Sequence, residues 1–309
     1  MSSHLPEFGS APIEYCPVLS ELACRPLYLM REDYSDEIGS GNKVRKLHAL
    51  APYLARLSVT DIILDGTSQS NSCMSVAHYA PSLGIRAHLI LTGDKTPTEN
   101  HHIMINSGAD IRYMGTWDPD EIQKHRLDLR DAIIHAGGVV YDAPTGLTDE
   151  NTVTAGCDIA KEIALFESDS TQAGVDFQDI YVACGTGGTA AGISWQDAAQ
   201  HAPSRVRGVL VANDIQFYED ATKGLYDSLG DVTRSMPFFD DTQLGGGYEQ
   251  NTPEQLTLQK KLVKQGLFFD TVYMLKTVSA ALEHSVRESR RGAGLIIHTG
   301  GSNQAKILR

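Results

Sequence analysis

Apolar residues along this chain follow two spacings. Between residues 43 and 57, Leu47, Leu50, Leu54 and Leu57 lie three or four positions apart, which is typical of a helix with one buried face. Short apolar runs bounded by polar turns are typical of buried strands. The pattern predicts strands at residues 27–30, 61–64, 86–91, 110–113, 138–141, 179–183, 206–212 and 295–298. It predicts helices at residues 43–57, 100–107, 121–135, 151–166, 192–201 and 273–290, and one that follows a polar turn at 67–72.

The predicted strands and helices alternate. Such alternation is typical of α/β proteins whose parallel sheets are covered by helices on both faces. A boundary near residues 145–152 separates two α/β units, and the N-terminal segment could pack with either of them. Residues 220–241 are the least readable stretch, and we assign no element to them.

Composition narrows the classes of protein that the chain can belong to. The 309 residues carry a formal net charge of -13, which argues against nonspecific binding to nucleic acid. No apolar run reaches the roughly 18 residues of a membrane span, and the N-terminus does not resemble a signal peptide. Five scattered cysteines form no CxxC pair, so we expect reduced, buried thiols in a cytoplasmic protein. His101 and His102 lack partners at metal-site spacing, so we expect them at the surface and expect no metal.

A glycine-rich loop follows the strand predicted at 179–183. It reads Gly185-Thr186-Gly187-Gly188-Thr189 and leads into a helix, where backbone N–H groups and the helix dipole attract an anion. Three interpretations are open. The loop could hold the phosphate of pyridoxal phosphate, it could bind a dinucleotide, or it could be a structural turn. The dinucleotide interpretation takes Gly185, Gly187 and Ala190 as G-x-G-x-x-[GA], with Asp214 as the ribose-binding acid.

Lys43 stands at the start of the helix predicted at 43–57. A lysine that forms an imine must be deprotonated part of the time, and repulsion from Arg45 and Lys46 would lower its pKa. The alternative is a solvated basic helix face. A second polar turn, Gly66-Thr67-Ser68-Gln69-Ser70-Asn71-Ser72, has hydroxyls and an amide at a helix N-terminus, as a carboxylate receptor requires. There the alternative is that Ser70 is an N-cap and nothing more.

These segments occur in the same order in a known family. The chain resembles the pyridoxal-phosphate-dependent 1-aminocyclopropane-1-carboxylate (ACC) deaminase and D-cysteine desulfhydrase family, which has the tryptophan-synthase β-like fold, fold type II. The family patterns are G-G-N-K-x-R-K-L, G-x-x-Q-S-N, T-G-[SG]-T-x-A-G, G-Y-G, D-P-V-Y-x-G-K and H-x-G-G. They are similar to residues 40–47, 66–71, 186–192, 247–249, 270–276 and 298–301 of this chain. The resemblance covers nearly the whole sequence.

The resemblance implies a fold and a cofactor. The fold is a two-domain α/β structure with open parallel sheets flanked by helices and with pyridoxal phosphate in the cleft between the domains. Residues 1–56 with 150–309 would form the large domain that binds the cofactor, and 57–149 the small domain. The resemblance also implies a homodimer and a small amino-acid substrate.

Roles for individual residues follow from the matched motifs. Lys43 would be the Schiff-base lysine, Asn71 would hydrogen-bond the 3'-oxygen of the cofactor, and residues 185–189 would bind its phosphate. Ser70, Asn71 and Ser72 would hold the substrate carboxylate, with Ser70 also a candidate nucleophile or proton carrier. Tyr248 and Tyr273 would face the substrate and move a proton.

The chain departs from the family near the substrate. Where ACC deaminases have Glu and desulfhydrase-like members have Thr, this chain has Met274, which cannot bond the pyridine nitrogen strongly. Thr299, from the matched H-T-G-G pattern, could supply that bond. A neutral acceptor makes the cofactor a weaker electron sink, which disfavours ring-opening of ACC. Leu275 and Thr271 replace the family's Gly and Pro.

The sequence therefore predicts a lyase or deaminase of the D-cysteine desulfhydrase kind. It would remove the α-proton of a small amino acid, then a β-substituent, to give a keto acid and ammonia. The alternatives are β-replacement or another specialised amino-acid transformation, and a catalytically silent protein that binds pyridoxal phosphate.

Overall fold

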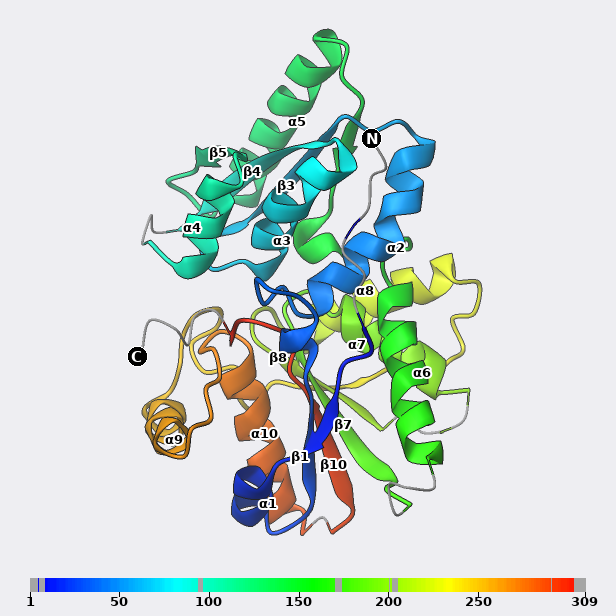
Figure 1. Cartoon of the computed structure of the whole chain (residues 1–309), viewed down its shortest axis with the longest axis vertical. Coiled ribbons are helices and arrows are strands. Elements are labelled where there is room, and N and C mark those ends of the chain that lie inside the picture. The colour runs from blue at the N-terminus through cyan, green and yellow to red at the C-terminus, as the bar shows by residue number, and fades with distance from the viewer. Residues whose placement is uncertain are drawn as a thin grey trace.

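The computed structural model describes residues 5, 9–93, 97–169, 174–199, 201, 205–289 and 291–302. Over these residues the strands form two sheets, the smaller in the upper half of Figure 1 and the larger in the lower half. The larger sheet has the strand order β1-β2-β10-β7-β8-β9, and the smaller has β5-β4-β3-β6. Neighbouring strands are parallel except β1 and β2, which are antiparallel.

The strands are β1 (Ile13–Tyr15), β2 (Leu27–Met30), β3 (Asp61–Thr67), β4 (Arg86–Thr92), β5 (Asp110–Tyr113), β6 (Val140–Asp142), β7 (Phe177–Cys184), β8 (Val206–Leu210), β9 (Phe238–Asp240) and β10 (Ala293–Ile297). The α-helices are α1 (Pro17–Ala23), α2 (Asn42–Arg56), α3 (Asn71–Tyr79), α4 (Glu99–Asn106), α5 (Pro119–His135), α6 (Thr154–Ser168), α7 (Gly188–Asp197), α8 (Ile215–Ser228), α9 (Pro253–Lys264) and α10 (Met274–Arg287). Short 3₁₀ turns are η1 (Glu32–Tyr34), η2 (Ala80–Leu83) and η3 (Thr145–Leu147).

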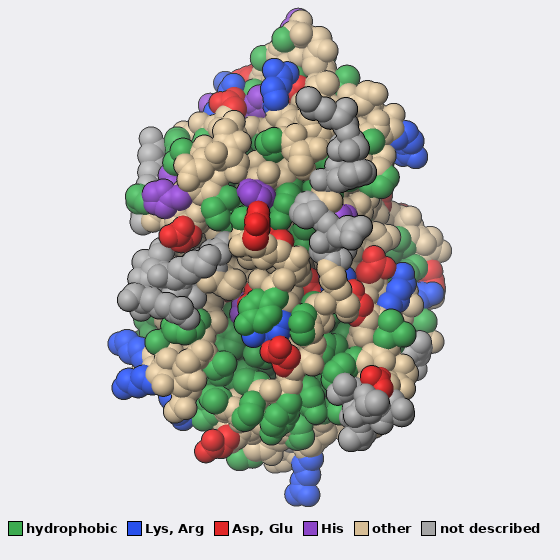
Figure 2. Space-filling view, in the orientation of Figure 1, with side chains coloured by type: hydrophobic (Ala, Val, Ile, Leu, Met, Phe, Trp, Pro, Cys, Tyr) green, Lys and Arg blue, Asp and Glu red, His purple; other side chains and the backbone are tan. Residues whose placement is uncertain are grey.

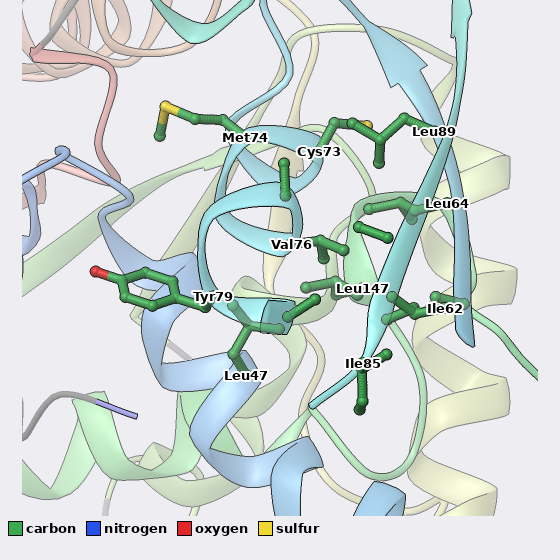
Figure 3. Close-up of a cluster of buried hydrophobic side chains, with 14 of the residues drawn as sticks. Leu47, Ile62, Leu64, Cys73, Met74, Val76, Tyr79, Ile85, Leu89 and Leu147 are labelled. Atoms are coloured by element: carbon green, nitrogen blue, oxygen red, sulfur yellow. The ribbon is translucent and has the colours of Figure 1, made fainter. Parts of the chain in front are cut away.

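The smaller sheet is buried on both faces, because successive side chains along its strands point to opposite faces and both faces are covered by helices. Ile62 and Leu64 of β3 join the core formed with α2, α3 and α4, whereas Ile63 between them joins the core with α5. In Figure 3, Cys73 and Val76 of α3 point toward Leu64 and Leu89 of the sheet. Leucines of α2 belong to the same core.

The larger sheet is covered in the same way. On one face Ile180 and Val182 of β7 pack with α6 and α7, and on the other Tyr181 packs with α1 and α10. The expected α/β class with parallel sheets flanked by helices is confirmed. The N-terminal segment, which we could assign to neither unit, supplies β1 and β2 to the larger sheet.

The assignment of strands to the two sheets can be compared with the predicted domain bounds, but it does not test them. All four strands of the smaller sheet lie between residues 61 and 142, and α2, which precedes them, contributes Val44, Leu47, Leu50 and Leu54 to its core. The division into 1–56 with 150–309 and 57–149 stays a prediction.

Several elements differ from the expected ones. The helix expected at 192–201 begins at Gly188, so glycines that we assigned to a loop form the first turn of α7. In and around the unassigned stretch the structure has α8 and β9, and it also has β1, α1 and α9, for which we predicted nothing. The C-terminal ends expected for the helices at 192–201 and 273–290 include Gln200 and Arg290, which lie outside the described residues.

The structure can be compared with three expectations from composition, which concern membrane spans, cysteines and histidines. No helix among the described residues is long and apolar enough to cross a membrane. The five cysteines are free, but Cys24 is exposed rather than buried. His102 is exposed as expected, whereas His101 is buried and lies 2.6 Å from the Tyr113 hydroxyl. No group of three or more His, Cys, Asp or Glu in the described part of the chain could hold a metal ion.

Candidate active site

A cavity of about 460 Å³ lies where strands of both sheets end. The last residues of β3 line it, as do Ala183 near the end of β7 and Ala212 just after β8. Ligands of open α/β sheets bind at these carboxyl ends, because the helix N-termini that follow point there. All twelve residues that we predicted to contact the cofactor or the substrate line this cavity: Lys43, Ser70, Asn71, Ser72, Gly185, Thr186, Gly187, Gly188, Thr189, Tyr248, Tyr273 and Thr299.

Lys43 is the second residue of α2, and the turn before it requires a glycine. Gly41 has φ +62°, and a Cβ there would lie 2.0 Å from the backbone oxygen of Thr299. The Lys43 ammonium donates to Asn42 Oδ1 at 3.1 Å. Desolvation at the cavity wall lowers the pKa of Lys43 to about 8. The amine is therefore available as a nucleophile near neutral pH.

The expected cause of that pKa shift was wrong. Arg45 turns away from Lys43 and pairs with Glu32 at 2.7 Å and Glu162 at 2.6 Å, which ties α2 to η1 and α6. Lys46 is buried, and its ammonium donates to Gly146 O and to Thr148 Oγ1. Burial is the main cause of the lowered pKa at Lys43, and neighbouring basic charge is not.

The glycine loop is shaped for an anion. Gly187 caps α7 with φ +79°, a conformation that glycine adopts without strain, and a Cβ at Gly188 would lie 2.5 Å from Thr148 Cγ2. Thr186 Oγ1 lies 2.6 Å from Thr148 Oγ1, and Thr189 Oγ1 accepts from Asn42 Nδ2 at 2.8 Å. Hydroxyls, close backbone and a helix N-terminus meet at one place, which suits a phosphate group.

The polar turn before α3 caps the helix and also lines the cavity. Ser70 Oγ accepts from the backbone N–H of Cys73 at 3.2 Å and lies 3.0 Å from Ser72 Oγ, so Ser70 is an N-cap and also lines the cavity. Asn71 Oδ1 accepts from Asn100 Nδ2 at 2.8 Å. This bond fixes the amide of Asn71, whose NH₂ group retains its hydrogens for another acceptor.

Tyr248 and Tyr273 form a pair. Their hydroxyls are 2.8 Å apart and their rings pack edge to face at 6.0 Å. Burial raises the pKa of both phenols above the ordinary value of 10. The pair therefore holds its protons over the neutral range and can pass one between its oxygens.

Thr299 reaches the cavity and Met274 supports it from behind. The backbone N–H and the hydroxyl of Thr299 donate to Met274 Sδ at 3.4 and 3.7 Å. Asp270 holds the start of α10 by accepting from the backbone N–H groups of Val272, Tyr273 and Met274. Burial raises the pKa of Asp270 to about 6. Met274 and Leu275 are fully buried and do not line the cavity.

Sequence analysis missed other residues at the site. Asn42, which bonds both Lys43 and Thr189, stands inside the matched motif and could have been found there. Asn100 comes from α4, and Trp117 and Phe217 line the cavity from distant segments, so no local pattern marks them. Asp214 is the N-cap of α8 and accepts from the Phe217 backbone N–H, as a capping residue does.

Fold and site together define the class of protein. Lys43, whose pKa is lowered, and the glycine loop line one cavity where strands of two α/β sheets end, an arrangement that fits a pyridoxal-phosphate-dependent enzyme of fold type II. The model of the family described as pyridoxal-phosphate dependent enzyme matches residues 5–300, and the chain belongs to that family. Its cofactor is pyridoxal phosphate, and this favours the phosphate interpretation of the glycine loop over the dinucleotide interpretation.

Similar proteins carry two activities in their names. The chain is 28% identical to the Arabidopsis thaliana bifunctional D-cysteine desulfhydrase/1-aminocyclopropane-1-carboxylate deaminase, over 89% of this chain and 72% of that protein. It is 27% identical to a D-cysteine desulfhydrase of Serratia proteamaculans, over 95% and 92%. The crystal structure of an ACC deaminase homologue, 25% identical, superposes with a TM-score of 0.85 over 96% of this chain and 91% of that one.

Proposed function

We propose that the enzyme acts on a small β-substituted amino acid, removes its α-proton and eliminates the β-substituent, as a D-cysteine desulfhydrase does. The carrying observation is that Lys43, the hydroxyl pair Tyr248–Tyr273 and the Ser70–Ser72 turn line one cavity. The relatives named for D-cysteine desulfhydrase activity support the same reaction.

Each side of the cavity has its own task. Gly185–Thr189 would hold the phosphate, Asn71 would bond the 3'-oxygen on the ring, and Thr299 would bond the ring nitrogen. When bound, pyridoxal phosphate supplies an aldehyde that condenses with amines and a ring that withdraws electrons from the substrate α-carbon. The N-terminus of α3 would bind the substrate carboxylate through backbone N–H groups and the Ser70 and Ser72 hydroxyls.

Proton transfers fall to the lysine and the tyrosines. With a pKa of about 8, Lys43 has roughly a tenth of its amines neutral at pH 7, so it can take the α-proton. Tyr248, backed by Tyr273, would donate a proton to the departing β-substituent. The substrate and one water thus give the keto acid, ammonia and the protonated leaving group.

The residues that would meet the ring nitrogen favour β-elimination over ring-opening. Met274 offers sulfur where ACC deaminases have a carboxylate, and the Thr299 hydroxyl donates to that sulfur. The Thr299 oxygen keeps its lone pairs and would accept a hydrogen bond from a protonated ring nitrogen, so that nitrogen would meet a neutral acceptor in place of a carboxylate. The β-replacement alternative was motivated by Met274 and Leu275, and it stays open, although both side chains are buried and neither lines the cavity.

Product analysis tests the proposal. D-cysteine, L-cysteine and β-chloroalanine are incubated with the holoenzyme and pyruvate and ammonia are measured, with Lys43→Ala and the exposed Lys223→Ala as a matched pair of variants. We expect pyruvate from at least one substrate, its loss in Lys43→Ala and its retention in Lys223→Ala. No turnover of any of the three would refute this substrate class, and α-proton exchange without product would leave a non-eliminating enzyme.

We also propose a homodimer in the cytoplasm. Hydrophobic side chains gather over the lower half of the face in Figure 2, and β1, an edge strand of the larger sheet, exposes 53% of Tyr15. Light scattering on the purified protein tests the assembly, with twice the chain mass of 33.6 kDa as the expected result. A single-chain mass at micromolar concentration would contradict it.

A further inference from the structure

A second cavity adjoins the first on the substrate side. Its volume is about 570 Å³, and it shares Thr67, Thr92, Trp117 and Tyr248 with the main cavity. The rest of its wall is polar and includes Ser68, Gln69, Glu249 and Gln250. A group attached to a substrate in the main cavity can therefore extend past Tyr248 into a polar space.

Glu249 is the charged residue in that wall, and its backbone is in an unusual conformation. Its φ is +60°, in the left-handed region that favours glycine, and the G-Y-G family pattern has glycine at this position. In this chain a large acidic residue occupies that strained position. Thr67 Oγ1, at the end of β3, donates to Glu249 Oε1 at 3.1 Å. This bond joins the loop after Gly247 to the smaller sheet and holds the carboxylate at the cavity wall.

The charge of Glu249 reaches the tyrosine pair. Burial is the main reason why the pKa of Tyr248 is raised, and the Glu249 carboxylate adds to it. Among the described residues that line the second cavity there is no Lys or Arg. The local field there therefore disfavours an anionic group and favours a cation or a nitrogen donor.

We propose that the second cavity is the subsite for the β-substituent of the substrate, and that Glu249 selects a substituent ending in an ammonium or another nitrogen donor. This inference rests on the proposed β-elimination. For a cysteine thioether the Cα–H bond breaks and the Cβ–S electron pair leaves with sulfur, which takes a proton. The free 2-aminoacrylate then reacts with one water to give pyruvate and ammonia.

Three thioethers with different terminal charge provide the test. S-(2-aminoethyl)cysteine and S-propylcysteine have side chains of equal length, one ending in ammonium and the other in methyl, and S-(carboxymethyl)cysteine ends in a carboxylate. Both enantiomers are assayed by pyruvate release. We expect kcat/KM for the aminoethyl compound to exceed that for the propyl compound by about tenfold, the usual effect of one charge-assisted hydrogen bond, and the carboxymethyl compound to be poorest.

Glu249→Gln is the decisive variant, because it removes the charge and keeps the shape. We expect it to bring the aminoethyl-to-propyl ratio close to one and to improve the carboxymethyl compound. Glu21→Gln, on α1 at the far end of the larger sheet, is the matched control and should leave every ratio unchanged. An unchanged ratio in Glu249→Gln, or an equal change in Glu21→Gln, would overturn the proposal.

Binding separates this inference from the proposed function. Lysine and 2-aminoheptanoate imitate the aminoethyl and propyl compounds but have no β-leaving group, so their affinity is measured by titrating the visible band of the holoenzyme. Tighter binding of lysine that depends on Glu249 would support the subsite even if no thioether yields pyruvate. Pyruvate from β-chloroalanine with no preference in either assay would support the reaction and reject the subsite.

Discussion

The wall of the main cavity around Gly185–Thr189 is made of backbone and small hydroxyls, whereas the wall around Tyr248 is made of large side chains. On the phosphate side, the geometry leaves no room for a Cβ at Gly188 and uses the start of α7. On the substrate side, the chain departs from its family pattern at Glu249, which lines the adjoining second cavity. It also departs at Met274, which is buried behind Thr299 and lines neither cavity. We infer from this difference that cofactor binding depends mainly on backbone geometry at one wall, and that substrate choice depends on the side chains at the other.

The largest effect expected on the substrate side is that of Tyr248→Phe. Loss of a positioned acid costs about 100-fold or more in rate, so we expect kcat to fall by that factor while the absorption of the bound cofactor stays unchanged. Because the pKa of Tyr248 is raised, the wild-type rate should show no loss from phenol ionisation below pH 10. Steady-state kinetics across pH check both points, with Tyr28→Phe, in the far core, as the control. A weakened affinity for the cofactor in Tyr248→Phe would contradict the assignment of cofactor binding to the Gly185–Thr189 wall and of the reaction to the Tyr248 wall.

On the phosphate side the expected effect is on cofactor affinity. Gly188→Ala places a methyl group 2.5 Å from Thr148 Cγ2, and overpacking of this kind costs about 1 to 3 kcal/mol. We expect the Kd for pyridoxal phosphate, followed by absorption or fluorescence, to rise about tenfold or more. Adding Thr148→Ala removes the clashing methyl and should restore part of the affinity. If the double variant binds no better than Gly188→Ala, the close approach of Thr148 is not the reason for the glycine.

Elements with a strong apolar pattern could be predicted almost to the residue. Leucines at helical spacing predicted 43–57, and α2 spans Asn42–Arg56. α8 was missed because Gly224 interrupts it and because few of its residues are apolar and buried, Tyr218, Leu225 and Tyr226 among them. The start of α7 was misplaced because glycines disfavour a helix locally, and packing of Gly192 against Gly156 of α6 overrides that preference.

The site could be predicted where the residues that line one wall of the cavity lie close together in the sequence and form a motif. Lys43 and the glycine loop stand in contiguous motifs, so the sequence alone identified them as candidates, and their roles stay predictions. The second cavity joins the end of β3 to a loop 182 residues later, and no local spacing encodes that contact. The sign of the pKa shift at Lys43 could be guessed, but its cause, burial, depends on the assembled fold.

A smaller effect concerns the loop that carries Tyr248. Lys276 is buried, and its ammonium donates to Leu244 O at 2.7 Å and Gly247 O at 2.6 Å, so it holds the residues before Tyr248. Desolvation lowers its pKa to about 8, so the unfolded chain binds more protons than the folded one between pH 8 and 10.5. Folding stability should therefore rise with pH in this window, and the rise should be smaller in Lys276→Met by on the order of 1 kcal/mol.

Urea unfolding of the apoprotein at pH 8 and pH 10 measures that difference. Lys43 has a similarly lowered pKa, but it is present in both proteins and cancels in the comparison. Lys276→Met should also raise KM through a looser Tyr248, while cofactor affinity, which depends on the opposite wall, stays the same. Equal pH slopes in the two proteins would mean that Lys276 titrates as an ordinary lysine.

The smallest expected effect is that of Met274→Leu. Leucine fills nearly the same volume but cannot accept the two bonds that Thr299 donates to Met274 Sδ, and a weak hydrogen bond contributes about a factor of two to five. The freed Thr299 hydroxyl can then donate toward the ring nitrogen, which would favour its unprotonated form. We expect kcat to fall about threefold and the pH titration of the bound cofactor's absorption to shift to lower pH. Met114→Leu, in the core beside α5, controls for the loss of a buried sulfur and should change neither. If both variants leave the pH titration of the cofactor's absorption unchanged, Thr299 sets the protonation of the ring without help from Met274, and the departure from the family at Met274 does not tune the cofactor.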